Sequence, residues 1–90
     1  KMAVGYTFVE LVPKNQPLEL VTALRDENFG VTLLEGEGRS GPRYILNIIL
    51  RRKDLSRLRA VIDRVDPDAF YTILDARGTK GGYIMGVKKK

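Results

Sequence analysis

Residues 44–50 constrain the fold of this 90-residue chain more than any other segment, because they would be apolar on both sides of an extended backbone. One side would carry Tyr44, Leu46, Ile48 and Leu50, and the other Ile45, Asn47 and Ile49. A strand of this kind is buried on both faces. We therefore expect a central strand with helices against one face and room for another subunit against the other. Asn47 is expected to make a buried hydrogen bond, and the alternative is that it faces a ligand.

The segments around this strand predict one α+β domain that occupies residues 1–90. Strands are expected from runs of β-branched and aromatic residues at 4–12, 31–35, 44–52 and 69–75. Helices are expected from apolar residues spaced three or four apart, at about 15–27 and 54–65. The order is β-α-β-β-α-β, the ferredoxin-like arrangement with an antiparallel sheet and two helices on one face. Residues 83–87 are compatible with a short fifth strand at the sheet edge.

The segment after the second helix carries two carboxylates and two aromatic rings. Asp66 and Pro67 end that helix, since a residue before proline is biased out of the helical region. Asp66 and Asp68 are explained by an Asx-type turn, with a role in positioning a ligand or a metal as the alternative. Phe70 and Tyr71 follow each other on a strand and so point to opposite faces. We expect Phe70 to be the one in the core.

The composition removes most catalytic chemistry. The chain has neither cysteine nor histidine, which excludes disulfides, zinc sites built on nitrogen and sulfur, and histidine-based catalysis. Glu35 and Glu37 share one side of a strand end, but two carboxylates without further oxygen donors make a poor cation site. We therefore predict that the domain is not an enzyme, with no catalytic residues, no metal and no cofactor.

The net charge of +5 is concentrated in the middle of the chain. Residues 39–64 hold eight basic and two acidic side chains, a net charge of +6. An anionic partner such as a nucleotide, a nucleic acid or lipid head groups is one interpretation, and a solvated surface is the other. For Arg57, Arg59 and Arg64 on the second helix we favour a solvated face, with Arg57 paired to Asp54. Nucleic-acid binding is disfavoured, because the central strand offers aliphatic residues where stacking rings would be needed.

A glycine- and arginine-rich connection between the second and third strands is the candidate ligand site. Closely spaced glycines can expose backbone N–H groups, and neighbouring arginines can pair with an anion. The predicted ligand-binding residues are Gly36, Gly38, Arg39, Gly41 and Arg43, with help from Arg51, Arg52, Gly81 and Gly82. The alternative is a hairpin loop whose glycines only permit the turn.

Several of these motifs together carry a family resemblance. They are Gly30-Val31-Thr32, the spacing of Gly36, Gly38 and Gly41, the apolar strand ending in Arg51-Arg52, Asp66-Pro67-Asp68-Ala69-Phe70, and Gly81-Gly82. Over about residues 6–86 the chain resembles the C-terminal domain of unknown function of bacterial YitT-type membrane proteins and of a related uncharacterised multi-span membrane family. Arg39 stands where YitT-type sequences more often carry an aromatic residue, so the form here is closer to the related family.

The resemblance implies a ferredoxin-like domain similar to PII-type signalling proteins, on the cytoplasmic side of a cell-membrane protein. A domain of this size buries only roughly 60–65% of its unfolded surface, so we expect a homo-oligomer, a trimer or a dimer. The chain starts with Lys1 before Met2, and we interpret it as a fragment or a chain with added terminal residues, soluble as given, whose missing N-terminal region holds the membrane part. The leading hypothesis is a regulatory module that senses a small anionic ligand, and the alternative is a structural oligomerisation module without a ligand.

Overall fold

The computed structural model describes residues 5–15, 17–79 and 82–89, with the backbone alone given beyond Leu74. The elements in chain order are β1 (Tyr6–Val12), α1 (Pro17–Asp26), β2 (Gly30–Gly38), β3 (Gly41–Arg51), the short 3-10 helix η1 (Arg52–Asp54), α2 (Leu55–Val65), β4 (Phe70–Thr79) and β5 (Gly82–Lys89). The predicted βαββαβ order is confirmed. The fifth strand forms and is longer than the 83–87 that the sequence indicated.

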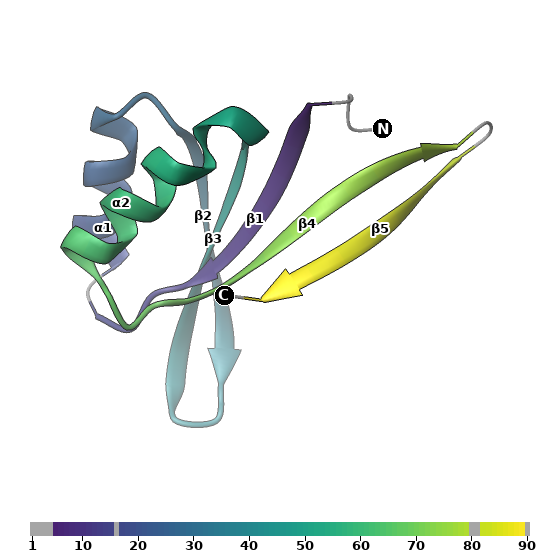
Figure 1. The fold of residues 1–90 in the computed structure, drawn as a ribbon. Coiled ribbons are helices and arrows are strands. Elements are labelled where there is room, and N and C mark those ends of the chain that lie inside the picture. The colour runs from purple at the N-terminus through teal and green to yellow at the C-terminus, as the bar shows by residue number, and fades with distance from the viewer. Residues whose placement is uncertain (1–4, 16, 80–81, 90) are drawn as a thin grey trace.

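The strands form one antiparallel sheet in the order β2-β3-β1-β4-β5, and both helices cover the same face (Figure 1). The ferredoxin-like fold class is therefore confirmed. β3 lies in the interior of the sheet between β1 and β2, as its two apolar sides predicted. The opposite face of the sheet carries no helix among the described residues.

The core lies between the helices and the sheet. Its residues come from every described layer: Val9, Leu11, Leu20, Val21, Leu24, Phe29, Val31, Leu46, Ile48, Leu50, Leu58, Val61, Ile62, Ala69, Tyr71 and Ile73. The alternation in β3 is confirmed, since Leu46, Ile48 and Leu50 are buried under the helices while Ile49 is exposed.

The prediction that Phe70 belongs to the core is wrong. Tyr71 is fully buried, whereas Phe70 is 52% exposed. The reason is the register of β4 against β1, which places Tyr71 opposite Leu11 and Phe70 opposite Val12. Leu11 faces the helices, and directly opposed residues of a sheet share a face, so Tyr71 has to be the core residue.

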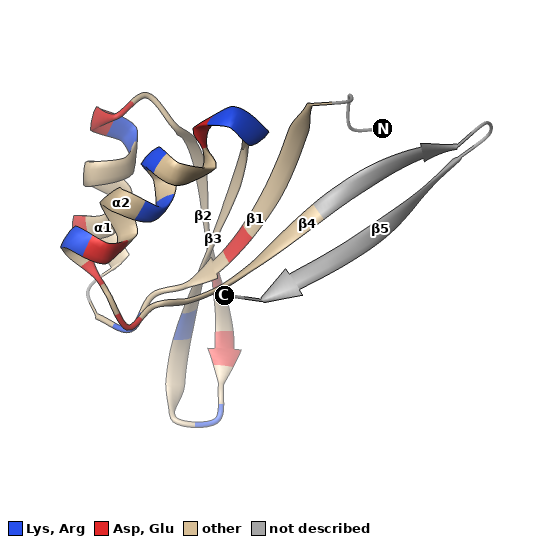
Figure 2. Cartoon of the chain, viewed as in Figure 1, with Lys and Arg blue, Asp and Glu red and all other residues tan. Residues whose placement is uncertain are grey.

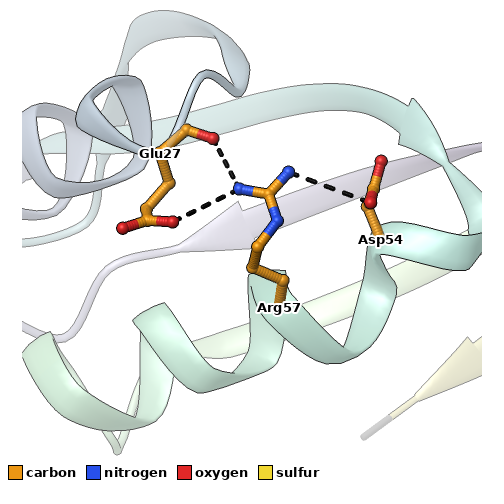
Figure 3. Close-up of polar contacts among 3 residues, drawn as sticks. All are labelled: Glu27, Asp54 and Arg57. Atoms are coloured by element: carbon orange, nitrogen blue, oxygen red, sulfur yellow. Dashed lines mark hydrogen bonds and ion pairs between the residues drawn. The ribbon is translucent and has the colours of Figure 1, made fainter.

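One arginine of α2 fastens the connection between α1 and β2 (Figure 3). Arg57 donates to the backbone carbonyl of Glu27 at 2.5 Å and contacts the Glu27 carboxylate at 3.4 Å. Its guanidinium lies 3.9 Å from the carboxylate of Asp54, the predicted partner, and 4.2 Å from the ring centroid of Phe29. Arg57 is exposed and paired with Asp54, as the sequence predicted, and in addition it holds the α1–β2 turn against α2.

Three connections lie at the same end of the strands, because all neighbouring strands are antiparallel. They are the β1–α1 connection, the turn between β2 and β3, and the α2–β4 connection. The β2–β3 hairpin extends beyond the helices at this end of the sheet (Figure 1). The start of β3 therefore lies beside the end of β1, and this neighbourhood forms the candidate site.

Candidate functional site

The glycines that the sequence assigned to an open loop lie in a regular hairpin. β2 continues to Gly38 and β3 begins at Gly41, so that the turn consists of Arg39 and Ser40 alone. Gly36 is paired with Arg43 and Gly38 with Gly41. Of the three glycines only Gly41 adopts a positive φ, at 128°. Their backbone therefore follows the ladder of the sheet and does not form the concave loop that we expected.

One hairpin glycine, Gly38, still has a specific effect, because it makes room for Arg43. A Cβ at position 38 would overlap Cγ and Cδ of Arg43, while a Cβ at position 36 would meet open space. The side chain of Arg43 therefore lies across Gly38.

A polar hollow of ≈ 470 Å³ lies at the base of the hairpin, between the start of β3 and the β1–α1 connection. Its lining residues are Val12, Pro13, Lys14, Asn15, Pro17, Pro42, Arg43 and Tyr44. Lys14 and Arg43 are its two cations, and no carboxylate is present among these lining residues. Three prolines fix the φ angles of the surrounding backbone, which stiffens the walls.

The buried carboxylate of Asp66 holds the β1–α1 connection in place. Asp66 is 1% exposed, and its Oδ2 accepts hydrogen bonds from the backbone N–H groups of Lys14 at 2.8 Å and Asn15 at 3.1 Å. Its Oδ1 accepts from Nδ2 of Asn15 at 3.2 Å. Asp66 also ends α2, where its own N–H donates to the carbonyl of Ile62. One side chain therefore fixes both the helix end and the segment that carries Lys14.

The tip of the hairpin is less suited to an anion. The hollow at Gly36, Gly38 and Gly41 is also lined by Glu35 and Glu37, whose carboxylates repel negative charge. Arg39 is exposed at the turn and lines a smaller hollow of ≈ 210 Å³ with Arg43. Arg43 lines both this hollow and the larger one, where Lys14 is the second cation.

The remaining predicted site residues lie at the other end of the sheet. Arg51 is eight residues from Arg43 along β3, a separation of roughly 27 Å at the rise of an extended strand. The guanidinium of Arg51 lies 5.0 Å from the ring centroid of Tyr6, and the N–H of Arg52 donates to the carbonyl of Gly5. Gly82 begins β5 opposite Thr79, and Gly81 lies outside the described residues. A single copy of the chain therefore does not bring the predicted residues together.

Lys14, Asn15 and Tyr44 were missed by the sequence interpretation. A signal for them was present, because the split βαβ topology requires the end of the first strand to lie beside the start of the third. Continuing the register of Leu11 with Leu46 by three residues sets Lys14 opposite Arg43. The pairing of a cation after β1 with a cation at the start of β3 was therefore readable from the predicted fold.

Metal-binding clusters and membrane-spanning helices are both absent from the part of the chain that the structure describes. No group of three or more acidic side chains there could hold a metal ion. None of its helices has the length and apolar character that crossing a bilayer requires.

The fold and this site define a small ferredoxin-like domain of PII-like architecture. Its backbone is similar to that of the Arabidopsis thaliana PII protein bound to citrate, with a TM-score of 0.55, 16% identity, and 94% of this chain and 74% of that chain covered. At this identity the similarity shows the fold alone. It is also similar to the crystal structure of an uncharacterised DUF2179 protein from Eubacterium ventriosum, with a TM-score of 0.60, 26% identity, and 73% of this chain and 93% of that chain covered.

The chain belongs to the family described as uncharacterised protein conserved in bacteria (DUF2179), whose model matches residues 29–81. A UPF0316 protein of Alkaliphilus metalliredigens is 47% identical over 90 residues, which is 100% of this chain and 52% of that protein. The chain thus spans about half the length of the curated relatives it matches. These comparisons indicate no catalytic function.

Proposed function

We propose that this domain is a regulatory module that binds a small anionic ligand, such as a nucleotide, at the base of the β2–β3 hairpin. The observation that carries the proposal is the hollow in which Lys14 and Arg43 stand together without a lining carboxylate, beside a connection fixed by Asp66. The proposal keeps Arg43 from the sequence-based site and moves the rest of the site from the hairpin tip to its base.

The chemistry of the hollow favours phosphate or carboxylate groups. A guanidinium can bind either group through two parallel hydrogen bonds, and an ammonium adds a compact positive charge. Nδ2 of Asn15 already donates to Asp66, and this orients the amide beside the two cations. A volume of ≈ 470 Å³ lies within the usual range for small-molecule sites, roughly 300–1,000 Å³.

The setting of the module in the whole protein is a further part of the proposal. The chain spans about half the length of its relatives, and its motifs resemble a domain attached to multi-span membrane proteins. We place the domain on the cytoplasmic side of such a protein, with self-association of the domain and ligand binding coupled to the membrane part. The fold that the domain shares with the Arabidopsis thaliana PII protein supports the regulatory part of this proposal.

Thermal denaturation with a panel of ligands tests the site. The panel contains nucleoside phosphates, cyclic dinucleotides and citrate, measured on the 90-residue chain and on the single variants Lys14→Ala, Arg43→Ala and Arg39→Ala. A ligand at 100 times its dissociation constant stabilises the folded state by about 2.7 kcal/mol, which for this size raises Tm by roughly 10–20 °C. We expect Lys14→Ala and Arg43→Ala to abolish the shift and Arg39→Ala to retain it.

A pair of glycine substitutions tests the position of Arg43 without removing its charge. Gly38→Ala should displace the Arg43 side chain and weaken the ligand-induced shift, whereas Gly36→Ala meets open space and should leave it unchanged. A shift lost with Arg39→Ala and kept with Arg43→Ala would return the site to the hairpin tip. No shift with any member of the panel would refute the proposal and favour a structural oligomerisation module.

A further inference from the structure

A second hollow, which is mainly apolar, adjoins the cationic one at the base of the hairpin. Its volume is ≈ 350 Å³, and its lining residues are Val12, Arg43, Tyr44, Ile45 and Phe70. Three of these residues, Val12, Arg43 and Tyr44, also line the hollow of ≈ 470 Å³ that contains Lys14. The two hollows therefore share a wall. A ligand bound by the two cations has a second, apolar hollow within its reach.

The pairing of the strands explains why the residues of the apolar hollow meet. Val12 of β1 stands opposite Phe70 of β4, and the register of β1 with β3, extended by one residue, sets Val12 opposite Ile45. Directly opposed residues share a face of the sheet, so the three side chains form one row across three strands. Arg43 is two residues before Ile45 on β3 and lies on the same face. A guanidinium therefore borders the row at the end nearest the hairpin.

The apolar hollow suits a flat ring better than a second charged group. No carboxylate is present among its lining residues, and Arg43 is its one cation. Phe70 is 52% exposed, while Val12 and Ile45 are half-buried beside it. An exposed aromatic ring next to aliphatic side chains offers a surface against which a planar group can stack. Removing such a surface from water on binding is favourable.

The spacing between the cations and the apolar row limits the kind of ligand that can use both. Lys14 lies two residues beyond Val12, and Arg43 two residues before Ile45, a separation of roughly 7 Å along an extended strand. The sugar of a nucleotide joins its phosphate to its base across a separation of this order. Citrate and inorganic phosphate carry polar groups throughout and would leave the apolar row exposed. The acyl chains of a phospholipid are much longer than a hollow of ≈ 350 Å³ can enclose.

The charges on this face also fix the direction in which such a ligand would lie. Glu10 is exposed and is paired with Thr72, which places both in the row next to Val12 and Phe70, on the side away from the cations. Figure 2 shows this arrangement, with a basic position on the hairpin and one acidic position on β1, separated by an uncharged part of the sheet. A carboxylate repels a phosphate and accepts hydrogen bonds from the amino group of a base. The anionic end of the ligand therefore belongs at the cations and its ring at the apolar row.

We propose that the ligand of this site is a nucleotide whose phosphate is bound by Lys14 and Arg43 and whose base packs in the apolar hollow. Phe70 supplies the aromatic surface for the base, and it is therefore the residue that distinguishes a nucleotide from an anion without a ring. This inference rests on the proposed function, because it uses the same two cations. It adds the apolar hollow to the site and excludes purely polar anions as its best ligands.

Isothermal titration calorimetry on the 90-residue chain measures the contribution of the base directly. AMP, GMP, CMP and UMP are compared with ribose 5-phosphate, which has the same sugar and phosphate without a base. Stacking of one base contributes a factor of about 5–150 in affinity. We expect the best of the four nucleotides to bind more tightly than ribose 5-phosphate by a factor in this range. Equal affinities would overturn the inference and leave the anion site of the proposed function intact.

A matched pair of variants assigns the contribution of the base to Phe70. Phe70→Ala should lower the affinity for the best nucleotide to that for ribose 5-phosphate, and should leave the affinity for ribose 5-phosphate unchanged. Ile49→Ala, at a position that is 59% exposed on the same face but four residues beyond Ile45, should change neither affinity. Lys14→Ala should weaken both ligands, because both carry the phosphate. Since Phe70 and Ile49 are exposed, both variants are expected to fold.

The other outcomes separate this inference from the proposed function. Nucleotide affinity that survives Phe70→Ala would overturn the inference alone. Absence of binding by all five ligands would refute both this inference and the nucleotide form of the proposed function. Binding to vesicles that contain phosphatidic acid, lost in Phe70→Ala and without any nucleotide binding, would assign the apolar hollow to a lipid and overturn the inference.

Discussion

Replacing Asp66 should destabilise the domain far more than replacing its neighbour Asp68. Asp66 is buried and accepts from two backbone N–H groups at 2.8 and 3.1 Å and from one side-chain amide at 3.2 Å, whereas Asp68 is exposed. Asp66→Ala removes the acceptor oxygens of all three hydrogen bonds at once. The two residues are two positions apart and carry the same group, so their comparison isolates the effect of the buried contacts.

The expected magnitude follows from these hydrogen bonds. A bond to a charged group contributes about 1.5–3 kcal/mol when its donor has no other partner. Lys14 and Asn15 are exposed, so water can take over part of their hydrogen bonding, and removing the carboxylate also relieves the cost of burying it. We therefore expect about 3 kcal/mol for Asp66→Ala, about half of that for Asp66→Asn, and less than about 0.5 kcal/mol for Asp68→Ala.

Urea unfolding followed by circular dichroism, together with thermal scans, measures these differences. For a domain of this size about 3 kcal/mol lowers Tm by roughly 12–24 °C. A loss below about 0.5 kcal/mol in Asp66→Ala would mean that the β1–α1 connection does not depend on this carboxylate. The assignment of Lys14 to a preformed hollow would then lose its support.

Two further stability predictions concern the aromatic pair of β4 and the arginines of α2. In urea unfolding at dilute protein, Tyr71→Ala should lower the free energy of unfolding by about 3–5 kcal/mol and Phe70→Ala by less than about 1 kcal/mol. The reason is that only the tyrosine lies in the core. A larger loss for Phe70→Ala than for Tyr71→Ala would contradict the register of β4 against β1. Arg57→Ala should cost about 1–2 kcal/mol, because it removes the contact with the carbonyl of Glu27. Arg59→Ala, on the same helix and exposed, should change the free energy of unfolding by less than about 0.5 kcal/mol, and equal effects at both arginines would show that the contacts of Arg57 do not stabilise the fold.

The alternation of apolar residues was enough to predict the order of the elements and the interior position of β3. It was not enough to decide between Phe70 and Tyr71, because adjacent strand residues satisfy the alternation equally well. The register of β4 against β1 decided between the two rings, because it places Tyr71 opposite the buried Leu11. The boundaries of the hairpin also differed from the predicted ones. Glycines favour turns locally and suggested a long loop, but the pairing between β2 and β3 extends through Gly36 and Gly38.

For the candidate site, too, the sequence pointed to some of the residues and only the structure showed the others. The arginines and glycines of the hairpin drew attention to Arg43, but Lys14 is far from it in sequence and carries no motif of its own. The distance between Arg43 and Arg51 follows from the length of β3. The strand that the sequence predicted at residues 44–52 already implied this distance. The role of Asp66 could not be read from its own turn, because its donors belong to a connection about 50 residues earlier.

By itself the sequence determined the fold class, the central strand, the end of α2 just before Pro67 and the absence of histidine and cysteine chemistry. These depend on local periodicity, on proline geometry and on composition, all of which act within a few residues. The tertiary structure alone decided which aromatic ring is buried, where Asp66 finds its donors, and that Oδ1 of Asn47 is buried without a hydrogen-bond partner among the described residues, contrary to the predicted hydrogen bond. Each of these depends on register between distant strands, which the packing of the whole sheet against two helices sets.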